Sequence, residues 1–148
     1  MSRKRKFVIQ KHDASRLHYD FRLEVGDVLA SWAVPKGLST EVNDKRLAIR
    51  VEDHGLDAID FEGVIPEGEY GAGTVVIWDR GDYEALIKDG DGDDDDELRS
   101  AIHGGSLKFL LHGEKLKGVY AMARTGERDG KEQWVIFKVD DKTGNSPP

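Results

Sequence analysis

The chain has 148 residues, a formal net charge of −7 and no cysteine. This length suits one hydrophobic core and is short for two ordinary ones, so we expect a single domain over 1–148 with its core at about 7–139. Without cysteine, disulfides and thiolate metal sites are excluded, and any metal must be bound by His, Asp or Glu.

The charge is distributed unevenly along the chain. Residues 1–50 carry a net charge of +5, residues 51–97 carry −15 and residues 98–148 carry +3. A basic surface that binds nucleic acid is therefore compatible with the acidic total. No apolar run is long enough for a signal peptide or a membrane span, so we expect a soluble, cytoplasmic protein with no membrane partner.

Most of the chain alternates apolar and polar residues in short runs separated by glycine. This period of two is typical of half-buried strands in an antiparallel sheet. So many short strands predict an all-β fold, a compact antiparallel β-barrel. The expected strands cover residues 7–10, 18–25, 31–34, 47–52, 74–79, 83–85, 106–112, 119–124 and 134–139.

One short helix is expected near residue 100. Asp96 or a neighbouring Asp can cap its beginning, and the acids there interact favourably with the helix dipole. Gly104 and Gly105 should end the helix after His103.

Three segments are expected to be irregular. Residues 88–97 (KDGDGDDDDE) should form an acidic surface loop, because the segment has nothing apolar to bury and its carboxylates repel one another. Asp94 and Ser100 stand where a calcium-binding EF-hand loop needs Gly and Glu. Residues 66–74 (PEGEYGAGT) lack the lysine of a phosphate-binding loop and predict a hairpin loop. Residues 141–148 should fray.

The segment KHDASRLHYDFRLE, residues 11–24, separates into two faces. In a strand over 18–25, alternate apolar residues face the core and the polar ones between them form an exposed row, spaced by about 7 Å. The expected core residues are Tyr19, Phe21, Leu23 and Val25, and the expected exposed residues are His18, Asp20, Arg22 and Glu24.

The segment KRLAIRVEDH, residues 45–54, has the same pattern. Three aliphatic residues should face the core while four polar ones share the opposite face, provided that the strand persists to its end. The expected core residues are Leu47, Ile49 and Val51, and the expected polar face holds Arg46, Arg50, Glu52 and His54.

Two chemistries fit these polar faces. His18 and Asp20, with His12 or His54, have the composition of the 2-His-1-carboxylate triad of iron oxygenases. Alternatively the ion is a hard divalent metal such as manganese, and Arg22, Arg46 and His54 receive a phosphate bound to it. The arginines favour phosphate.

Five ordered motifs carry a family resemblance. HDASRLHYDFRLE, SWAVPKG, RLAIRVEDH, DFEGVIPEGEYGAGTVVIWDRG and LKFLLHGEKLKG span nearly the whole chain. Together they resemble the 3′-phosphoesterase domain of bacterial DNA ligase D and its stand-alone relatives. The resemblance implies a β-barrel enzyme that trims 3′ ends of DNA in nonhomologous end joining, with manganese preferred. Enzymes of this family remove a 3′-terminal ribonucleoside and convert the resulting 3′-phosphate to a hydroxyl.

The resemblance also implies roles for individual residues. The metal ligands of the family's first motif fall on His12, His18 and Asp20. Its phosphate-binding residues fall on Arg22 and His54, and the latter either holds the phosphate or protonates the leaving oxygen. Further residues needed in the family match Lys36 and Arg46, and Glu52 is an additional candidate.

Two features depart from the family pattern. Members commonly carry Tyr four residues after the VEDH histidine, where this chain has Ala58. Ligase-embedded members have an N-terminal extension, whereas six residues precede Phe7 here. These departures predict a phosphodiesterase activity that is weak or altered beside a retained phosphomonoesterase activity.

The expected substrates are DNA or DNA/RNA 3′ ends, and separate ligase and polymerase subunits are the expected protein partners. Two other classes compete with this interpretation. A non-catalytic DNA-end-binding module would use the basic N-terminal third without needing the metal ligands together. An iron oxygenase would require ferrous iron and oxygen.

Overall fold

A computed structural model describes residues 4–140, so the fraying expected for 141–148 lies outside the described residues. Within that range no helix is both long and apolar enough to cross a membrane. The elements in chain order are β1 (Arg5–Asp13), β2 (Leu17–Val25), β3 (Val28–Val34), β4 (Arg46–Gly55), the 3-10 helix η1 (Leu56–Asp60), β5 (Gly63–Ile65), β6 (Gly73–Leu86), α1 (Asp95–His103), β7 (Ser106–Gly113), β8 (Lys117–Arg128) and β9 (Lys131–Lys138).

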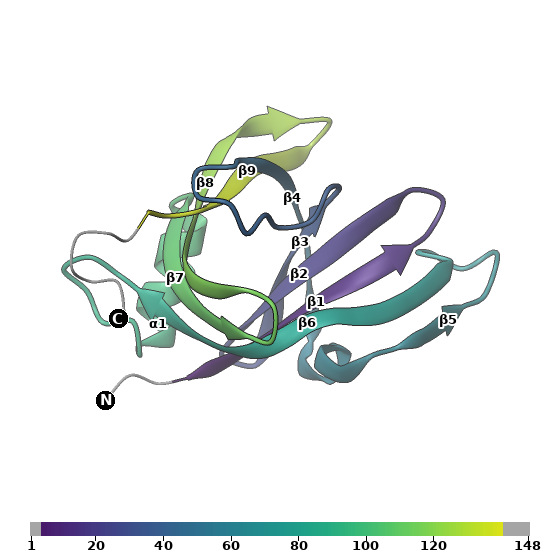
Figure 1. Cartoon of the computed structure of the whole chain (residues 1–148), viewed down its shortest axis with the longest axis horizontal. Coiled ribbons are helices and arrows are strands. Elements are labelled where there is room, and N and C mark those ends of the chain that lie inside the picture. Colours follow the sequence, from purple (N-terminus) through teal and green to yellow (C-terminus); the bar gives the residue numbers. More distant parts are fainter. Residues whose placement is uncertain (1–3, 141–148) are drawn as a thin grey trace.

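Eight antiparallel strands close into a barrel (Figure 1). Neighbouring strands pair in the order β1-β2-β3-β4-β9-β8-β7-β6, and β6 pairs back with β1. The short β5 pairs with the beginning of β6 and adds a ninth strand at that end. Closure leaves no long unpaired edge. The predicted antiparallel barrel with one short α-helix is confirmed for the described residues.

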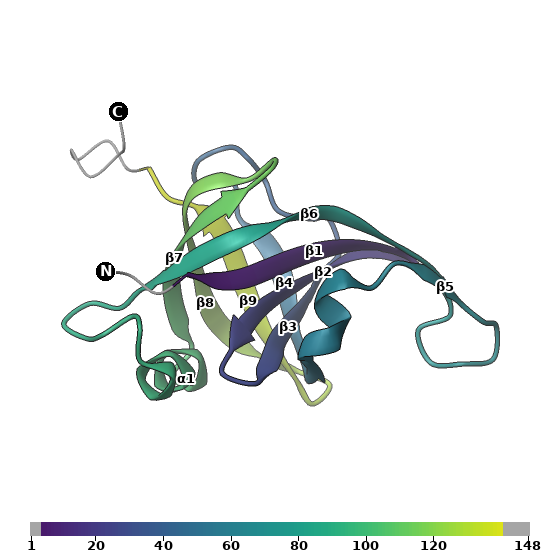
Figure 2. The ribbon, with the colours of Figure 1, turned by 90° about the horizontal axis from the view of Figure 1, so that it is seen from below.

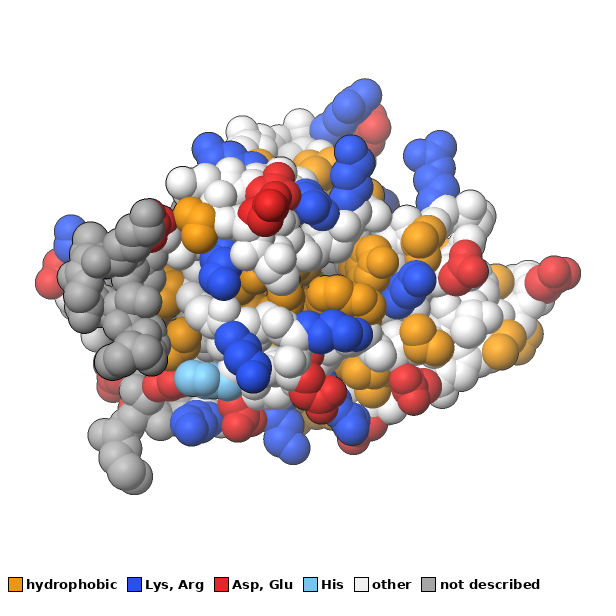
Figure 3. Space-filling view, viewed as in Figure 1, with side chains coloured by type: hydrophobic (Ala, Val, Ile, Leu, Met, Phe, Trp, Pro, Cys, Tyr) orange, Lys and Arg blue, Asp and Glu red, His pale blue; other side chains and the backbone are white. Residues whose placement is uncertain are grey.

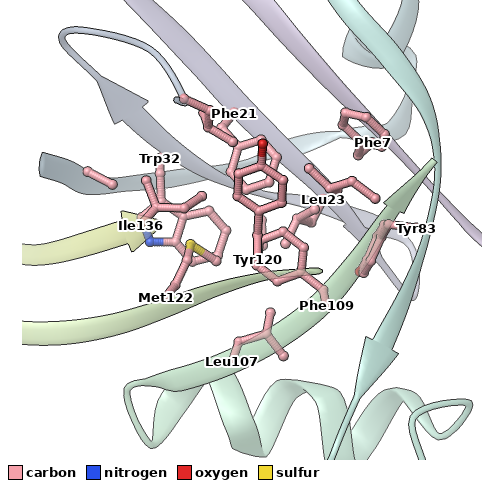
Figure 4. Packing of buried hydrophobic residues seen from close by; sticks show 14 of the residues in the cluster. Phe7, Phe21, Leu23, Trp32, Tyr83, Leu107, Phe109, Tyr120, Met122 and Ile136 are labelled. Carbon is pink, nitrogen blue, oxygen red and sulfur yellow. The ribbon is translucent and has the colours of Figure 1, made fainter. Parts of the chain in front are cut away.

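Alternate residues of the strands fill the barrel with aromatic and aliphatic side chains (Figure 4). The ring of Phe21 lies at its centre, with centroid distances of 5.8 Å to Phe109 and 6.3 Å to Trp32. Phe21 and Leu23 are fully buried, as predicted, while Tyr19 is half-buried. Each large buried side chain stabilises the fold by about 1.5–3 kcal/mol, so the orientation of β2 is strongly determined.

The predicted strands 74–79 and 83–85 are one continuous strand, β6. It pairs with β1 on one side and with β7 on the other, so its hydrogen bonding continues through residues 80–82. Gly81 permits this close approach, because a Cβ there would lie 2.1 Å from the carbonyl oxygen of His112. The short β5 and η1 were not predicted, since neither contains a buried residue.

Helix α1 packs against the barrel through Leu98 and Ile102, which are buried. The Asp94 side chain caps its beginning by accepting a hydrogen bond of 2.8 Å from the Asp96 backbone. The helix ends at the predicted residue, but the acidic loop is shorter than predicted. Its last three residues form the first turn of the helix, where their charges interact favourably with the dipole.

Candidate metal and phosphate site

The candidate site lies on the outer surface of β1 and β2, which we call the site face. Burial of Phe21 and Leu23 directs the alternate residues of β2 outward. Side chains that lie directly opposite on paired strands share a face. The paired residues on the site face are His12 and His18, Gln10 and Asp20, and Val8 and Arg22.

His12, His18 and Asp20 form a cluster of potential metal ligands. One ligand atom from each residue lies within 4.8 Å of the others. His12 Nδ1 is 3.2 Å from Asp20 Oδ2, and His18 Nε2 is 3.3 Å from Asp20 Oδ1. The structure thus brings together the three residues predicted as ligands. Two imidazoles and a carboxylate suit several divalent transition metals.

Backbone carbonyls orient both imidazoles of this cluster. His12 Nε2 lies 2.6 Å from the Gly71 oxygen, and His18 Nδ1 lies 3.0 Å from the Arg16 oxygen. A carbonyl only accepts hydrogen bonds, so in the neutral rings these nitrogens carry the protons and the other two face Asp20 with lone pairs. Contacts of this kind orient histidine metal ligands. The residues present therefore fit a divalent cation.

The pKa shifts in the cluster indicate attraction for positive charge. Burial by itself raises the pKa of the Asp20 carboxyl, but the hydrogen bond with His18 and the charge of Arg22 outweigh it, and the pKa is lowered. Once protonated, His18 donates a hydrogen bond from Nε2 to Asp20, and this bond raises the pKa of His18. A divalent cation would displace the proton that these two groups share.

Arg22 lies beside the cluster and is held on several sides. Its Nε donates to Gln10 Oε1 at 2.7 Å, and its Nη1 lies 2.9 Å from Ser31 Oγ and 2.9 Å from His54 Nδ1. Nη2 is 3.7 Å from Asp20 Oδ2, which is an ion pair without a hydrogen bond. Within residues 4–140 the N–H groups of Nη2 have no hydrogen-bond acceptor, so they can bind an anion.

A β-bulge brings His54 to the site face. The pairing of β3 with β4 shifts between Leu29 and Ser31, and this reverses the alternation of β4 before His54. Arg22 can only donate, so His54 Nδ1 accepts and the ring proton is on Nε2. The Glu52 carbonyl oxygen, 3.0 Å from the same nitrogen, cannot supply a proton either. Burial and the charge of Arg22 lower the pKa of His54, which keeps it neutral near pH 7.

Comparison with known proteins identifies the family. The model of the DNA ligase D 3′-phosphoesterase domain matches residues 10–124. The chain belongs to this family. It is 49% identical to the multifunctional non-homologous end joining protein LigD of Pseudomonas aeruginosa over 95% of this chain and 16% of that protein. It is 49% identical to its counterpart in Mycobacterium tuberculosis over 90% of this chain and 16% of that protein. The chain thus spans about a sixth of these relatives.

The site of this 3′-phosphoesterase-domain family member is more buried than predicted. Asp20 and Arg22 were expected in an exposed row, but they are 7% and 8% exposed. Residues 52–74 cross over the site face between β4 and β6 (Figure 2) and contact Gln10, His12 and Arg22. The alternation of a strand shows which side chains share a face, but it does not reveal which segment covers them.

The predicted faces of β4 are wrong. Ala48 is fully buried opposite Trp134, whereas Leu47 is 45% exposed. The guanidinium of Arg50 lies over the Trp32 ring, 4.9 Å from its centroid. The large indoles of Trp32 and Trp134 fill the barrel next to β4, so the small Ala48 and the long Arg50 can occupy the inward-facing positions of β4. The bulge then separates these residues from His54, and the expected common polar face does not exist.

Lys36 and Arg46 form a second group. Arg46 Nη1 donates to the carbonyl oxygens of Lys36 at 2.7 Å and of Gly37 at 3.1 Å. Lys36 and Glu52 are exposed. Within residues 4–140, no hydrogen bond or ion pair joins Lys36 or Arg46 to the metal-ligand cluster.

Gln10 was not predicted as a site residue. It is 1% exposed, accepts from Arg22 and donates to the Ala58 and Phe61 oxygens at 2.9 and 3.1 Å. Gln10 therefore joins Arg22 to η1. The contact at position 58 is made by the backbone oxygen, so it does not depend on the side chain of Ala58. Extending the predicted strand 7–10 to His12 would have placed Gln10 on the same face as that histidine.

Proposed function

We propose that this protein is a manganese-dependent phosphoesterase that processes 3′ ends of DNA in nonhomologous end joining. Its proposed reactions are removal of a 3′-terminal ribonucleoside, which leaves a 3′-phosphate, and hydrolysis of that phosphate to a 3′-hydroxyl. Family membership supports the reaction class. The relatives are named as non-homologous end joining proteins, which supports the repair pathway.

One observation carries the proposal: an anion-binding pair borders the metal-ligand cluster. Arg22 contacts Asp20 on one side and His54 on the other, so a phosphate bound by Arg22 would also adjoin the cation. A fixed guanidinium beside a metal site binds carboxylate or phosphate, and family membership favours phosphate here. A phosphoesterase needs one to stabilise charge on the phosphate oxygens.

His12, His18 and Asp20 would hold the cation, which supplies Lewis acidity and lowers the pKa of a bound water. Arg22 binds non-bridging phosphate oxygens through Nη2, while Gln10 and Ser31 fix its orientation. His54 donates a hydrogen bond from Nε2 to the phosphate. Since burial and the charge of Arg22 lower the pKa of His54, its proposed role is to hold the phosphate and not to act as a general acid.

Lys36 and Arg46 are proposed to bind the DNA backbone away from the reacting phosphate, because they are separate from the metal-ligand cluster. Glu52 is proposed to adjust the charge state of His54, since its negative charge raises the pKa that Arg22 and burial lower. Separate ligase and polymerase proteins remain the proposed partners, and the cytoplasm the proposed location. One domain over 1–148 is likewise a proposal.

The test is incubation of the protein with manganese and a primer-template that ends in one 3′-ribonucleotide. We expect a shortened 3′-phosphate product and its dephosphorylated form. His18→Ala should abolish both products, whereas His103→Ala, which removes an exposed histidine on α1, should retain them.

Failure of the wild-type protein to form either product would refute the proposal. DNA binding without metal-dependent product would identify an end-binding module instead. Activity that requires oxygen and ferrous iron would favour the oxygenase, so the reaction is repeated without oxygen.

A further inference from the structure

Residues 52–74, which we call the cover segment, pass over the site face and are anchored by the site itself. His54 accepts from Arg22, the Phe61 oxygen accepts from Gln10, and the Gly71 oxygen contacts His12. None of these 23 positions is buried. Polar contacts with site residues and backbone pairing with β3 and β6, and not packing of apolar side chains, therefore hold the cover segment in place.

The apolar side chains of the cover segment face solvent. Leu56 is 40% exposed, Phe61 41%, Val64 73% and Tyr70 98%. Hydrophobic side chains are also visible at the β5 end of the molecule in Figure 3. A segment that binds through its carbonyls and presents aromatic rings to water is suited to contact an apolar partner.

The two aromatic residues lie at or next to backbone groups that contact the two halves of the site. Phe61 is joined through Gln10 to the phosphate-binding Arg22, and its ring is 3.6 Å from where a Cβ on Gly63 would lie. Tyr70 precedes Gly71, whose oxygen contacts the metal-ligand candidate His12. A strand end whose phosphate is bound by Arg22 would therefore adjoin the segment that carries both rings.

The charge of the cover segment decides which part of a nucleic acid it can bind. It contains seven Asp or Glu residues and no Lys or Arg. Backbone phosphates are therefore repelled, whereas an uncharged nucleobase is not. Bases stack on aromatic side chains through their flat faces with little sequence preference.

We propose that Phe61 and Tyr70 stack on the nucleobase of the 3′-terminal nucleotide while Arg22 and His54 bind its phosphate. This inference rests on the proposed function. The exposed rings bind a base that has left the stack, so the protein recognises strand ends and does not select among the four bases.

The test compares two primers with a 3′-phosphate, one with an ordinary terminal nucleotide and one with a terminal abasic analogue. Tyr70→Ala should raise the KM for the ordinary primer roughly 5- to 150-fold, the range expected from loss of one stacked base. It should leave the KM for the abasic primer at the wild-type value, which is itself higher than for the ordinary primer. Tyr70→Trp should restore tight binding.

Leu86→Ala is the matched control, because Leu86 is 40% exposed at the far end of β6. It should behave as wild type with both primers. Equal KM values for wild type and Tyr70→Ala on the ordinary primer would overturn the inference, as would an equal loss on the abasic primer. If wild type releases phosphate from neither primer, the proposed function fails and the inference with it.

Discussion

Replacing Gln10 by Leu tests whether this buried amide holds Arg22 and η1 together. The change removes a bond to a charged guanidinium, worth about 1.5–3 kcal/mol, and two bonds to carbonyls, worth about 1 kcal/mol each. The free energy of unfolding should fall by about 4 kcal/mol. For a protein of this size the melting temperature should then fall by roughly 10–20 °C.

Thermal unfolding and phosphate release together separate the two roles of Gln10. Below its melting temperature, Gln10→Leu should show a lower kcat for phosphate release with unchanged manganese affinity, because Arg22 loses its orientation while the metal ligands are intact. Gln10→Glu keeps an oxygen for Arg22 and should retain more of the kcat, although it loses both carbonyl contacts. A melting temperature of Gln10→Leu within about 2 °C of wild type would show that Gln10 does not hold Arg22 and η1 together.

Three further predictions concern the cation, His54 and the barrel. Asp20→Asn should weaken manganese binding at least about 100-fold by calorimetry, because loss of a residue that only supports a metal ligand costs up to about 100-fold and loss of a ligand should cost more. His103→Ala should leave the affinity unchanged. Unchanged affinity in Asp20→Asn would show that Asp20 is not a ligand. An NMR titration of His54 in the metal-free protein should give a pKa below 6.5, and Arg22→Gln should raise that pKa. Because the folded state disfavours protonation of His54, the free energy of unfolding should fall as the pH falls below 6.5. An unchanged pKa in the variant would contradict the contact between Arg22 and His54. Asp79→Asn should lower the free energy of unfolding by about 2–4 kcal/mol in denaturant titrations. The reason is that the buried carboxylate accepts hydrogen bonds from the backbone N–H groups of Glu114, Lys115 and Leu116. A change under about 0.5 kcal/mol would mean that the asparagine amide replaces these bonds.

The sequence by itself predicted the features that depend on local patterns. Alternation over 18–25 placed Phe21 and Leu23 in the core and the polar residues on the opposite face. The run of Asp residues before the helix and Gly104 after it predicted where the helix begins and ends, because capping interactions involve residues close together in the sequence. The strand pattern singled out His18 and Asp20, and the family resemblance added His12 as the third candidate metal ligand.

Only the tertiary structure decided how the site is completed. A bulge in the pairing of β3 with β4 turns His54 toward Arg22 and leaves Arg46 elsewhere, and no pattern within the 45–54 segment reveals such a register shift. The cover segment contacts Gln10, His12 and Arg22, although it is distant in sequence and has no buried residue of its own. The sequence therefore indicated candidate ligands for a metal and a phosphate, while contacts between distant segments decided which of these candidates lie together, because register and coverage depend on the whole barrel.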